Sequence, residues 1–162
     1  MSRFAVLIGE INHGLADLDK ITCQTQALLK KVEVTADDDY LGTIALNVHS
    51  FYSGAERIFR DIASSIDNAL PEGADWHRRL LRQMAIAVPD IRPAVLSEAS
   101  LKQLDELCRF RHVVRNVYAF ELVPERVNDV ATELPNCLLQ LERDLRSFCE
   151  FLAALNGSLS GS

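Results

Sequence analysis

A stripe of apolar side chains with helical spacing runs through residues 41–66 without a slip, and no other feature constrains the fold so strongly. The stripe consists of Leu41, Ile44, Ala45, Val48, Phe51, Tyr52, Ala55, Ile58, Phe59, Ile62, Ala63 and Ile66. Apolar residues that recur every three or four positions cover one face of an α-helix. The stripe therefore predicts a long helix over residues 38–70 that buries one side along its whole length.

Comparable spacing predicts further helices over residues 3–32, 76–88, 97–118 and 124–155, with antiparallel neighbours joined by short loops. Asp75 and Ser97 are expected to cap two of these helices, Pro124 suits the first turn of the last one, and Pro135 is expected to kink it. The fold class is thus an all-α, up-and-down bundle of about five helices. It should form a single domain over residues 1–156, followed by a flexible tail over residues 157–162. Because several helices carry long apolar stripes, we also expect a homodimer.

Composition narrows the class of protein. The chain has 162 residues, of which 48% are apolar and 25% charged, as in an ordinary globular domain. The net charge of −6 argues against a surface that coats nucleic acid by bulk electrostatics, although it leaves room for a small basic cleft. The four cysteines have no CxxC spacing, so we expect reduced core thiols. Neither a signal peptide nor a membrane span is expected, and the predicted location is cytoplasmic.

Residues 108–118 gather most of the chemically useful side chains of the chain. On a helical wheel Arg111, Arg115 and Tyr118 share one face, and Arg109, His112 and Asn116 complete the polar side. One turn upstream, a seam of leucines occupies the angle that the arginines take later. Either the helix bends near residues 108–110, or the arginines extend a buried seam into a cleft between helices or subunits. Cations in such a cleft need an anionic partner.

The residue types limit the chemistry. The four histidines are dispersed and no HExxH pair occurs, so neither a metal nor another cofactor is expected. Glycine-rich phosphate loops and a G-x-S-x-G elbow are also absent from the sequence. Arginine matches phosphate by its planar fork, and histidine can move protons near neutral pH. An RNA phosphodiester suits that pair, because its 2′-hydroxyl needs only a base and charge stabilisation.

A structural alternative stays open for the same cluster. Arg109, Arg111 and Arg115 could instead pair with carboxylates of the bundle. The candidates are Asp105, Glu106 and Glu121. In the long central helix, Glu56 and Arg60 lie four residues apart and are expected to pair in the same way.

The segment Arg111-His-Val-Val-Arg-Asn-Val-Tyr118 resembles the signature of HEPN domains, and in particular of HepT-like ribonuclease toxins. Three further blocks are similar to the same subfamily and occur in the expected order. They are Tyr52-Ser-Gly-Ala-Glu-Arg-Ile-Phe59, Asp75-Trp-His-Arg-Arg-Leu-Leu-Arg-Gln-Met84 with Ile91-Arg-Pro93, and Leu104-Asp-Glu with Arg109-Phe-Arg-His112. The likeness covers roughly residues 40–150.

The resemblance implies a dimeric helical bundle with two motif copies facing one cleft. It also implies metal-independent endoribonuclease activity in a type VII-like HEPN/MNT toxin–antitoxin pair. The partner would be an MNT-type nucleotidyltransferase antitoxin, which can transfer AMP to the motif tyrosine. Carried over by position, Arg111 is the motif arginine and Tyr118 the motif tyrosine and AMPylation candidate.

One position departs from the family motif. Asn116 stands where the motif has histidine, and an amide cannot act as a general base. In a working nuclease, Arg109, Arg111 and Arg115 would bind the phosphate, Asn116 would orient it, and His112 or a group of the partner subunit would move the proton. The alternatives are a catalytically degenerate HEPN domain that binds RNA or a nucleotide, or regulates the nucleotidyltransferase, and a purely structural bundle.

Overall fold

The computed structural model describes residues 3–116 and 121–160, and this part of the chain is all-α, with a single isolated β-bridge between Val88 and Arg92. The helices in chain order are α1 (Ala5–Thr35), the 3-10 turn η1 (Asp38–Tyr40), α2 (Leu41–Ile62), the π-helical turn η2 (Ala63–Asp67), α3 (Trp76–Ala85), α4 (Glu98–Asn116), α5 (Pro124–Thr132) and α6 (Leu134–Ser160). The predicted all-α bundle is confirmed.

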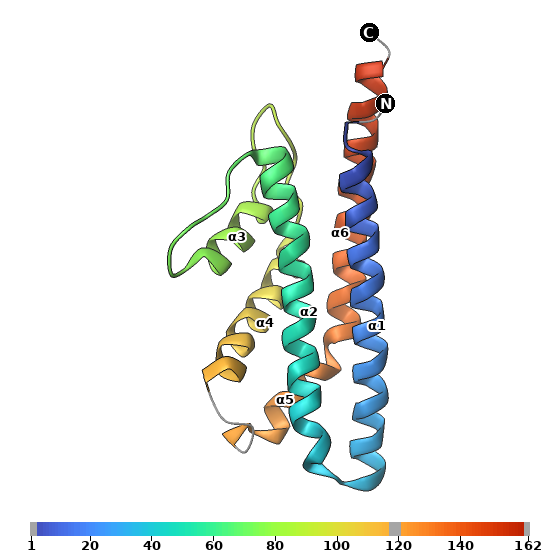
Figure 1. Ribbon diagram of the computed structural model, residues 1–162, viewed down its shortest axis with the longest axis vertical. Coiled ribbons are helices and arrows are strands. Elements are labelled where there is room, and N and C mark those ends of the chain that lie inside the picture. The colour runs from blue at the N-terminus through green and yellow to red at the C-terminus, as the bar shows by residue number, and fades with distance from the viewer. Residues whose placement is uncertain (1–2, 117–120, 161–162) are drawn as a thin grey trace.

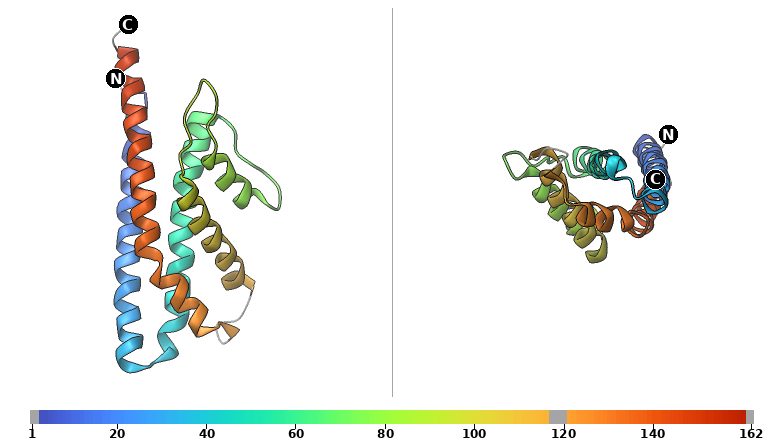
Figure 2. Two further views of the ribbon diagram at one scale, coloured as in Figure 1. Left: turned by 180° about the vertical axis from the view of Figure 1, so that it is seen from behind. Right: turned by 90° about the horizontal axis from the view of Figure 1, so that it is seen from below.

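The long helix α2 lies at the centre of the molecule (Figures 1 and 2). On one side it packs against α1, which in turn lies beside α6, and on the other side it packs against α3 and α4. The N-terminal end of α1 lies beside the C-terminal end of α6. There the Phe4 backbone N–H donates to Asn156 Oδ1 at 3.4 Å. The predicted apolar stripe explains this position, because Val48, Phe51 and Phe59 of α2 are completely buried.

Two glycines allow α1 and α2 to approach closely. A Cβ atom at Gly14 would lie 2.8 Å from Ile58 Cδ1, and one at Gly54 would lie 2.9 Å from Leu18 Cδ2. Carbon atoms do not approach so closely without displacement of a neighbour. Glycine weakens a helix by about 1 kcal/mol relative to alanine, and here the loss is compensated by tighter packing between the two helices.

The connection between α2 and α3 differs from the sequence prediction. Helix α3 runs in the same direction as α2, because the start of α3 contacts the middle of α2 and its end contacts η2. Residues 68–75 therefore return along α2 before α3 begins (Figure 1). The prediction that neighbouring helices are antiparallel and joined by short loops is wrong for this pair. Asp75 is the N-cap residue of α3, but its side chain makes no capping hydrogen bond.

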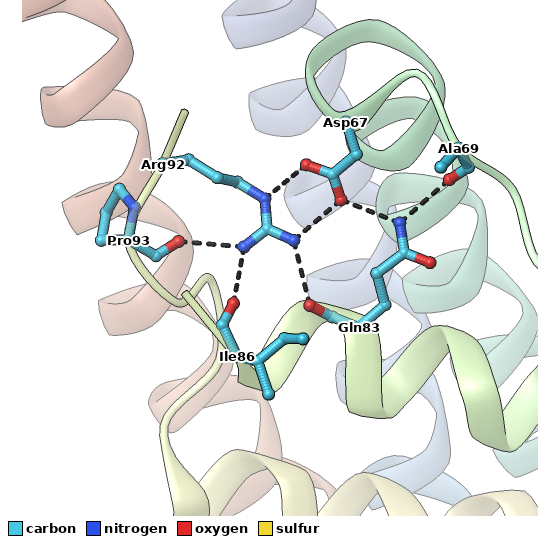
Figure 3. Close-up of polar contacts among 6 residues, drawn as sticks. All are labelled: Asp67, Ala69, Gln83, Ile86, Arg92 and Pro93. Carbon is cyan, nitrogen blue, oxygen red and sulfur yellow. Dashed lines mark hydrogen bonds and ion pairs between the residues drawn. The ribbon is translucent and has the colours of Figure 1, made fainter. Parts of the chain in front are cut away.

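A buried arginine in the segment after α3 binds the last residue of η2 (Figure 3). Arg92 Nε donates to Asp67 Oδ1 at 2.6 Å and its Nη2 donates to Asp67 Oδ2 at 2.8 Å. The remaining guanidinium hydrogens reach the backbone carbonyls of Ile86, Pro93 and Gln83. Gln83 Nε2 also donates to Asp67 Oδ2. The two charged side chains are only 0% and 4% exposed, so each compensates the other in the interior.

The predicted last helix is interrupted where the sequence indicated a kink. It is divided into α5 and α6 around Glu133, two residues before Pro135. Proline has no N–H, so the carbonyl of Ala131 lacks its usual helical partner. Gln26 Nε2 of α1 donates to that carbonyl at 3.0 Å, which stabilises the break and joins it to α1. Helix α6 continues to Ser160, beyond Gly157, where the sequence suggested a flexible tail.

The cysteines are all free, but they are not all core thiols. Cys137 is buried, Cys108 and Cys149 are half-buried, and Cys23 is exposed. The prediction of a core thiol is therefore wrong for Cys23, which faces outward from α1. Within the described ranges, no helix has the length and apolar character that crossing a membrane requires.

Candidate functional site

Helix α4 carries one of its arginines, Arg111, into the space between helices. Ser97 caps its first turn, as predicted, by accepting a hydrogen bond from the Ser100 backbone N–H at 3.3 Å. Leu104 and Leu107 form a buried seam, and Arg111 follows one turn later on that seam and is half-buried. Of the two possibilities that the sequence left open, the arginine extends the buried seam. Its guanidinium group therefore lies among α2, α3 and α4.

A chain of polar contacts joins those three helices. Glu56 Oε2 of α2 lies 2.6 Å from His77 Nδ1 of α3, and His77 Nε2 lies 3.4 Å from Arg111 Nη1 of α4. The imidazole ring also stacks on Trp76, with a centroid separation of 3.7 Å. The side chains of His77 and Glu56 are only 19% and 9% exposed. Trp76 therefore contacts the face of the imidazole, and Glu56 and Arg111 contact its two ring nitrogens.

Two buried donors beside these polar contacts have no hydrogen-bond partner among the described residues. They are Nε of Arg111 and the hydroxyl of Tyr52. Burial raises the pKa of Tyr52 well above its usual value, and the neighbouring Cys108 thiol and Glu56 carboxylate raise this pKa further. The phenol therefore lies close to the Cys108 thiol and the Glu56 carboxylate. Unpartnered buried donors are costly in a core and are typical of functional sites.

Arg115 is exposed on α4, and its positive charge acts on His49 of α2. The pKa of His49 is lowered first by burial, and then by the positive charges of Arg111 and Arg115, while Glu56 opposes the shift. Both arginines therefore act on one imidazole of α2, in agreement with the shared face that the helical wheel predicted. Among residues 3–116 and 121–160, no ion pair joins either arginine to a carboxylate.

The other predicted site residues have different surroundings. Arg109 Nη2 lies 2.9 Å from Asp105 Oδ2, so the structural alternative is confirmed for this arginine. Asn116 is exposed, and its Nδ2 donates to the backbone carbonyl of His112 at 2.7 Å and lies 3.3 Å from His112 Nδ1. The amide is thus directed back toward its own helix. Tyr118, the modification candidate, lies outside the described residues.

Two neighbouring pockets open at the surface of α3 and α4. One has a volume of about 380 Å³ and is lined by Ala74, Asp75, His77, Arg78, Cys108, Arg109, Arg111 and His112. The other has a volume of about 500 Å³ and is lined by Arg78, Leu81, Arg82, Glu98, Leu101, Lys102, Asp105 and Arg109. Both volumes are typical of sites for small ligands. Because Arg78 and Arg109 line both pockets, the two form one continuous basic surface.

The sequence did not identify two members of this site. Glu56 was expected to pair with Arg60, but its carboxylate contacts His77, and Arg60 instead lies over the Trp76 ring at 5.1 Å. In the sequence, His77 stands beside Arg78 and Arg79 and has no spacing that marks it as a site residue. The only signal in the sequence was indirect, since each residue lies within one of the blocks that resemble the HepT-like subfamily.

Comparison with protein families places this protein among the HEPN-type domains, in agreement with its helical bundle and its arginine-bearing α4. The model of the HepT-like protein family matches residues 43–152, which is more than half of the chain, and the chain belongs to this family. The matched range includes α3, α4 and all but the first two residues of α2, and so contains the whole site. Comparison with curated proteins and with solved structures gives no significant match.

Proposed function

We propose that this protein is a HepT-like toxin that cleaves RNA without a metal ion, with Arg111 and Arg115 holding the scissile phosphate. The observation that supports this most directly is the state of Arg111. Its guanidinium group is half-buried, lines a pocket and has no carboxylate partner among the described residues. A desolvated cation is unfavourable unless an anion compensates it. A phosphodiester that enters the pocket supplies that anion.

The chemistry of RNA suits this arrangement. A guanidinium group binds two phosphate oxygens through parallel hydrogen bonds and stabilises the charge that develops as the phosphorus is attacked. The nucleophile is the 2′-hydroxyl of the substrate, so the protein needs to supply positive charge and a proton acceptor. The expected products are a 2′,3′-cyclic phosphate and a 5′-hydroxyl. DNA lacks the 2′-hydroxyl and would not react.

The basic surface along α3 and α4 offers a path for the nucleotides beside the cleavage point. Arg78, Arg82, Lys102 and Arg109 lie along it, although the carboxylate of Asp105 contacts both Arg78 and Arg109. The protein carries a net charge of −6, so cations gathered on one surface favour binding there. RNA affinity should therefore fall with salt, and the dependence of log K on log salt should weaken by about 0.7 for each phosphate contact removed.

The resemblance of the motif to HepT-like toxins implies an assembly as well. We propose a homodimer in which two copies of the site face one cleft, and an MNT-type nucleotidyltransferase antitoxin that modifies Tyr118. Analytical ultracentrifugation tests the dimer, and a monomer at micromolar concentration would contradict it. Incubation with the nucleotidyltransferase and ATP, followed by mass spectrometry, tests the modification. AMP found elsewhere, with Tyr118 unmodified, would contradict the assignment.

The decisive experiment is cleavage of end-labelled RNA by the purified protein in the presence of EDTA. Arg111→Ala should lower the single-turnover rate by about 10²–10³-fold, as removal of one preorganised charge typically does. Arg143→Ala is the matched control, because this exposed arginine of α6 lines neither pocket, and it should cleave at the wild-type rate. Cleavage by Arg111→Ala at the wild-type rate would contradict the proposal.

A second function is favoured by one observation. Asn116 occupies the motif histidine position, and its amide donates to the backbone carbonyl of His112 in its own helix. A degenerate domain would bind RNA in the same cleft without cleaving it. It would show binding that depends on Arg111, no products, and no growth arrest when expressed without its antitoxin.

A further inference from the structure

The structure brings a second imidazole to the motif arginine, although the motif histidine is replaced. His77 is 34 residues earlier in the chain, on a different helix, yet its Nε2 lies 3.4 Å from Arg111 Nη1. Both residues line the 380 Å³ pocket. A proton acceptor in this position would be adjacent to any phosphate that Arg111 holds. The geometry therefore favours a proton acceptor on α3, outside the α4 motif.

The contact with Glu56 determines how the His77 ring presents its nitrogens. A carboxylate accepts hydrogen bonds and does not donate them, so the 2.6 Å contact requires that Nδ1 carry the hydrogen. In the neutral ring the lone pair then lies on Nε2, the nitrogen that faces Arg111. Stacking on Trp76 limits rotation of the ring out of this position. The imidazole is thus oriented as a base before any substrate arrives.

We propose that His77 is the general base of RNA cleavage, in place of the motif histidine, and that Glu56 is the residue that positions it. The proposal rests on the nuclease function proposed above. It assigns the proton transfer to a pair formed between α2 and α3, outside the α4 motif. Arg111 then has two roles, because it binds the phosphate and lies next to the base.

The reaction balances without a co-reactant other than water. The 2′-hydroxyl gives its proton to His77 Nε2 while its oxygen forms a bond to phosphorus. The bond between phosphorus and the 5′-oxygen breaks, and the leaving oxygen takes a proton from water. The resulting hydroxide combines with the proton that His77 releases. Glu56 stabilises the imidazolium form while it exists.

His112 is less suited to the same task, although it also lines the pocket. It is exposed, and its Nδ1 lies 3.3 Å from the Asn116 amide, a neutral group. His77 has a carboxylate at 2.6 Å and a stacked ring. An imidazole that a carboxylate orients is better placed to accept the proton than an exposed one without such a partner. Variants of His77 and His112 therefore test which of the two histidines accepts the proton.

The experiment measures three quantities for wild type and for His77→Gln, Glu56→Gln and His112→Gln. They are the single-turnover cleavage rate with EDTA, the affinity for RNA carrying 2′-O-methyl groups, and the thermal unfolding temperature. We expect His77→Gln to lower the rate by about 10²–10⁴-fold with affinity unchanged within a few-fold. His13→Gln is the matched control, because this exposed histidine of α1 lines neither pocket at α3 and α4, and it should retain the rate within a few-fold. His112→Gln should lose less of the rate than His77→Gln. His77→Asn replaces His77→Gln if the latter does not fold.

A pH–rate profile distinguishes positioning from a purely structural role for Glu56. Besides Glu56, the charged or titratable groups around His77 are Arg111, Arg109, Cys108 and His112 of α4, and Asp75 and Arg78 near the start of α3. Glu56→Gln keeps the shape of the side chain and removes its charge. The acidic limb of the profile should move to lower pH, because the imidazolium loses its carboxylate partner.

The outcomes separate the two proposals. If wild type cleaves no RNA tested, the nuclease function fails and this inference fails with it. If wild type cleaves and a folded His77→Gln cleaves within threefold of it, only the inference is overturned. A loss of affinity that accounts for the whole loss of rate would also overturn it, because His77 would then act in binding. An unchanged profile in Glu56→Gln would exclude the positioning role.

Discussion

Removal of the Arg92 side chain should be among the most destabilising single substitutions in this protein. Arg92→Ala leaves Asp67 buried with Gln83 Nε2 as its remaining side-chain donor. It also leaves three backbone carbonyls without the donor they now have. Breaking a buried ion pair by removal of one partner costs about 3–5 kcal/mol, chiefly because the other charge stays buried. We expect a loss in this range.

The assay is equilibrium unfolding in urea, followed by circular dichroism. For a domain of this size, about 3–5 kcal/mol corresponds to a fall in Tm of roughly 6–20 °C. Arg79→Ala is the control, because this exposed arginine of α3 donates one hydrogen bond to the Glu72 carbonyl. Its loss should change stability by no more than about 0.5 kcal/mol. Arg92→Lys should also destabilise the protein, because an ammonium group cannot reproduce the planar fork.

A double-mutant cycle tests the cause of the loss. Asp67→Asn and Arg92→Ala should together cost less than the sum of the two single changes, by at least about 2 kcal/mol, because the double variant leaves no uncompensated buried charge. A cost below about 1 kcal/mol for Arg92→Ala, or strict additivity in the cycle, would refute this account of the buried ion pair.

Three further predictions follow from packing and ionisation. Gly54→Ala should destabilise the protein by up to about 2 kcal/mol, because its Cβ would overlap a buried leucine of α1. A Cβ at Gly9 would lie in open space, so Gly9→Ala should be neutral or stabilising. Urea unfolding measures the stability of both variants. Cys23 should react with a thiol reagent in the native state, and Cys137 only on unfolding, because burial raises its pKa to about 12. The pKa of His49 is lowered from 6.5 chiefly by burial, so the unfolded state binds more protons below that pH, and folding stability should fall as pH decreases below 6.5. His49→Gln should weaken this decline in unfolding curves measured at several pH values, and an identical decline would contradict the assignment.

The sequence predicted the helices well because their buried faces repeat at the helical period. The stripe of α2 required no knowledge of its neighbours, since every turn carries an apolar residue on the same side. Pro135 similarly indicated the interruption of the last helix through its own missing N–H. The direction of α3 could not be predicted, because it depends on how residues 68–75 and the buried Arg92 arrange the chain in space.

The candidate site could be predicted only where it lies within one helix. The common face of Arg111 and Arg115 follows from helical geometry, and both act on His49 as that geometry requires. The contact between Glu56 and His77 joins residues 21 positions apart on different helices. Glu56 had a reasonable local interpretation, as an i,i+4 salt bridge with Arg60, and no local pattern distinguished His77 from the arginines beside it. Local spacing cannot decide between such partners, because tertiary packing determines which one is within reach.

The buried ion pair and the candidate base depend on each other through α3. This helix has only 10 residues and would not be stable alone, so its contacts with α2 determine its position. Near its start His77 contacts Glu56, and near its end Gln83 contacts Asp67, which Arg92 also holds. Loss of Arg92 would release the contact between Gln83 and Asp67. The contact between His77 and Glu56 would then be the one left to position the imidazole. Arg92→Ala should therefore cleave RNA more slowly than wild type even at temperatures where circular dichroism shows it fully folded, since proton transfer depends steeply on the position of the base.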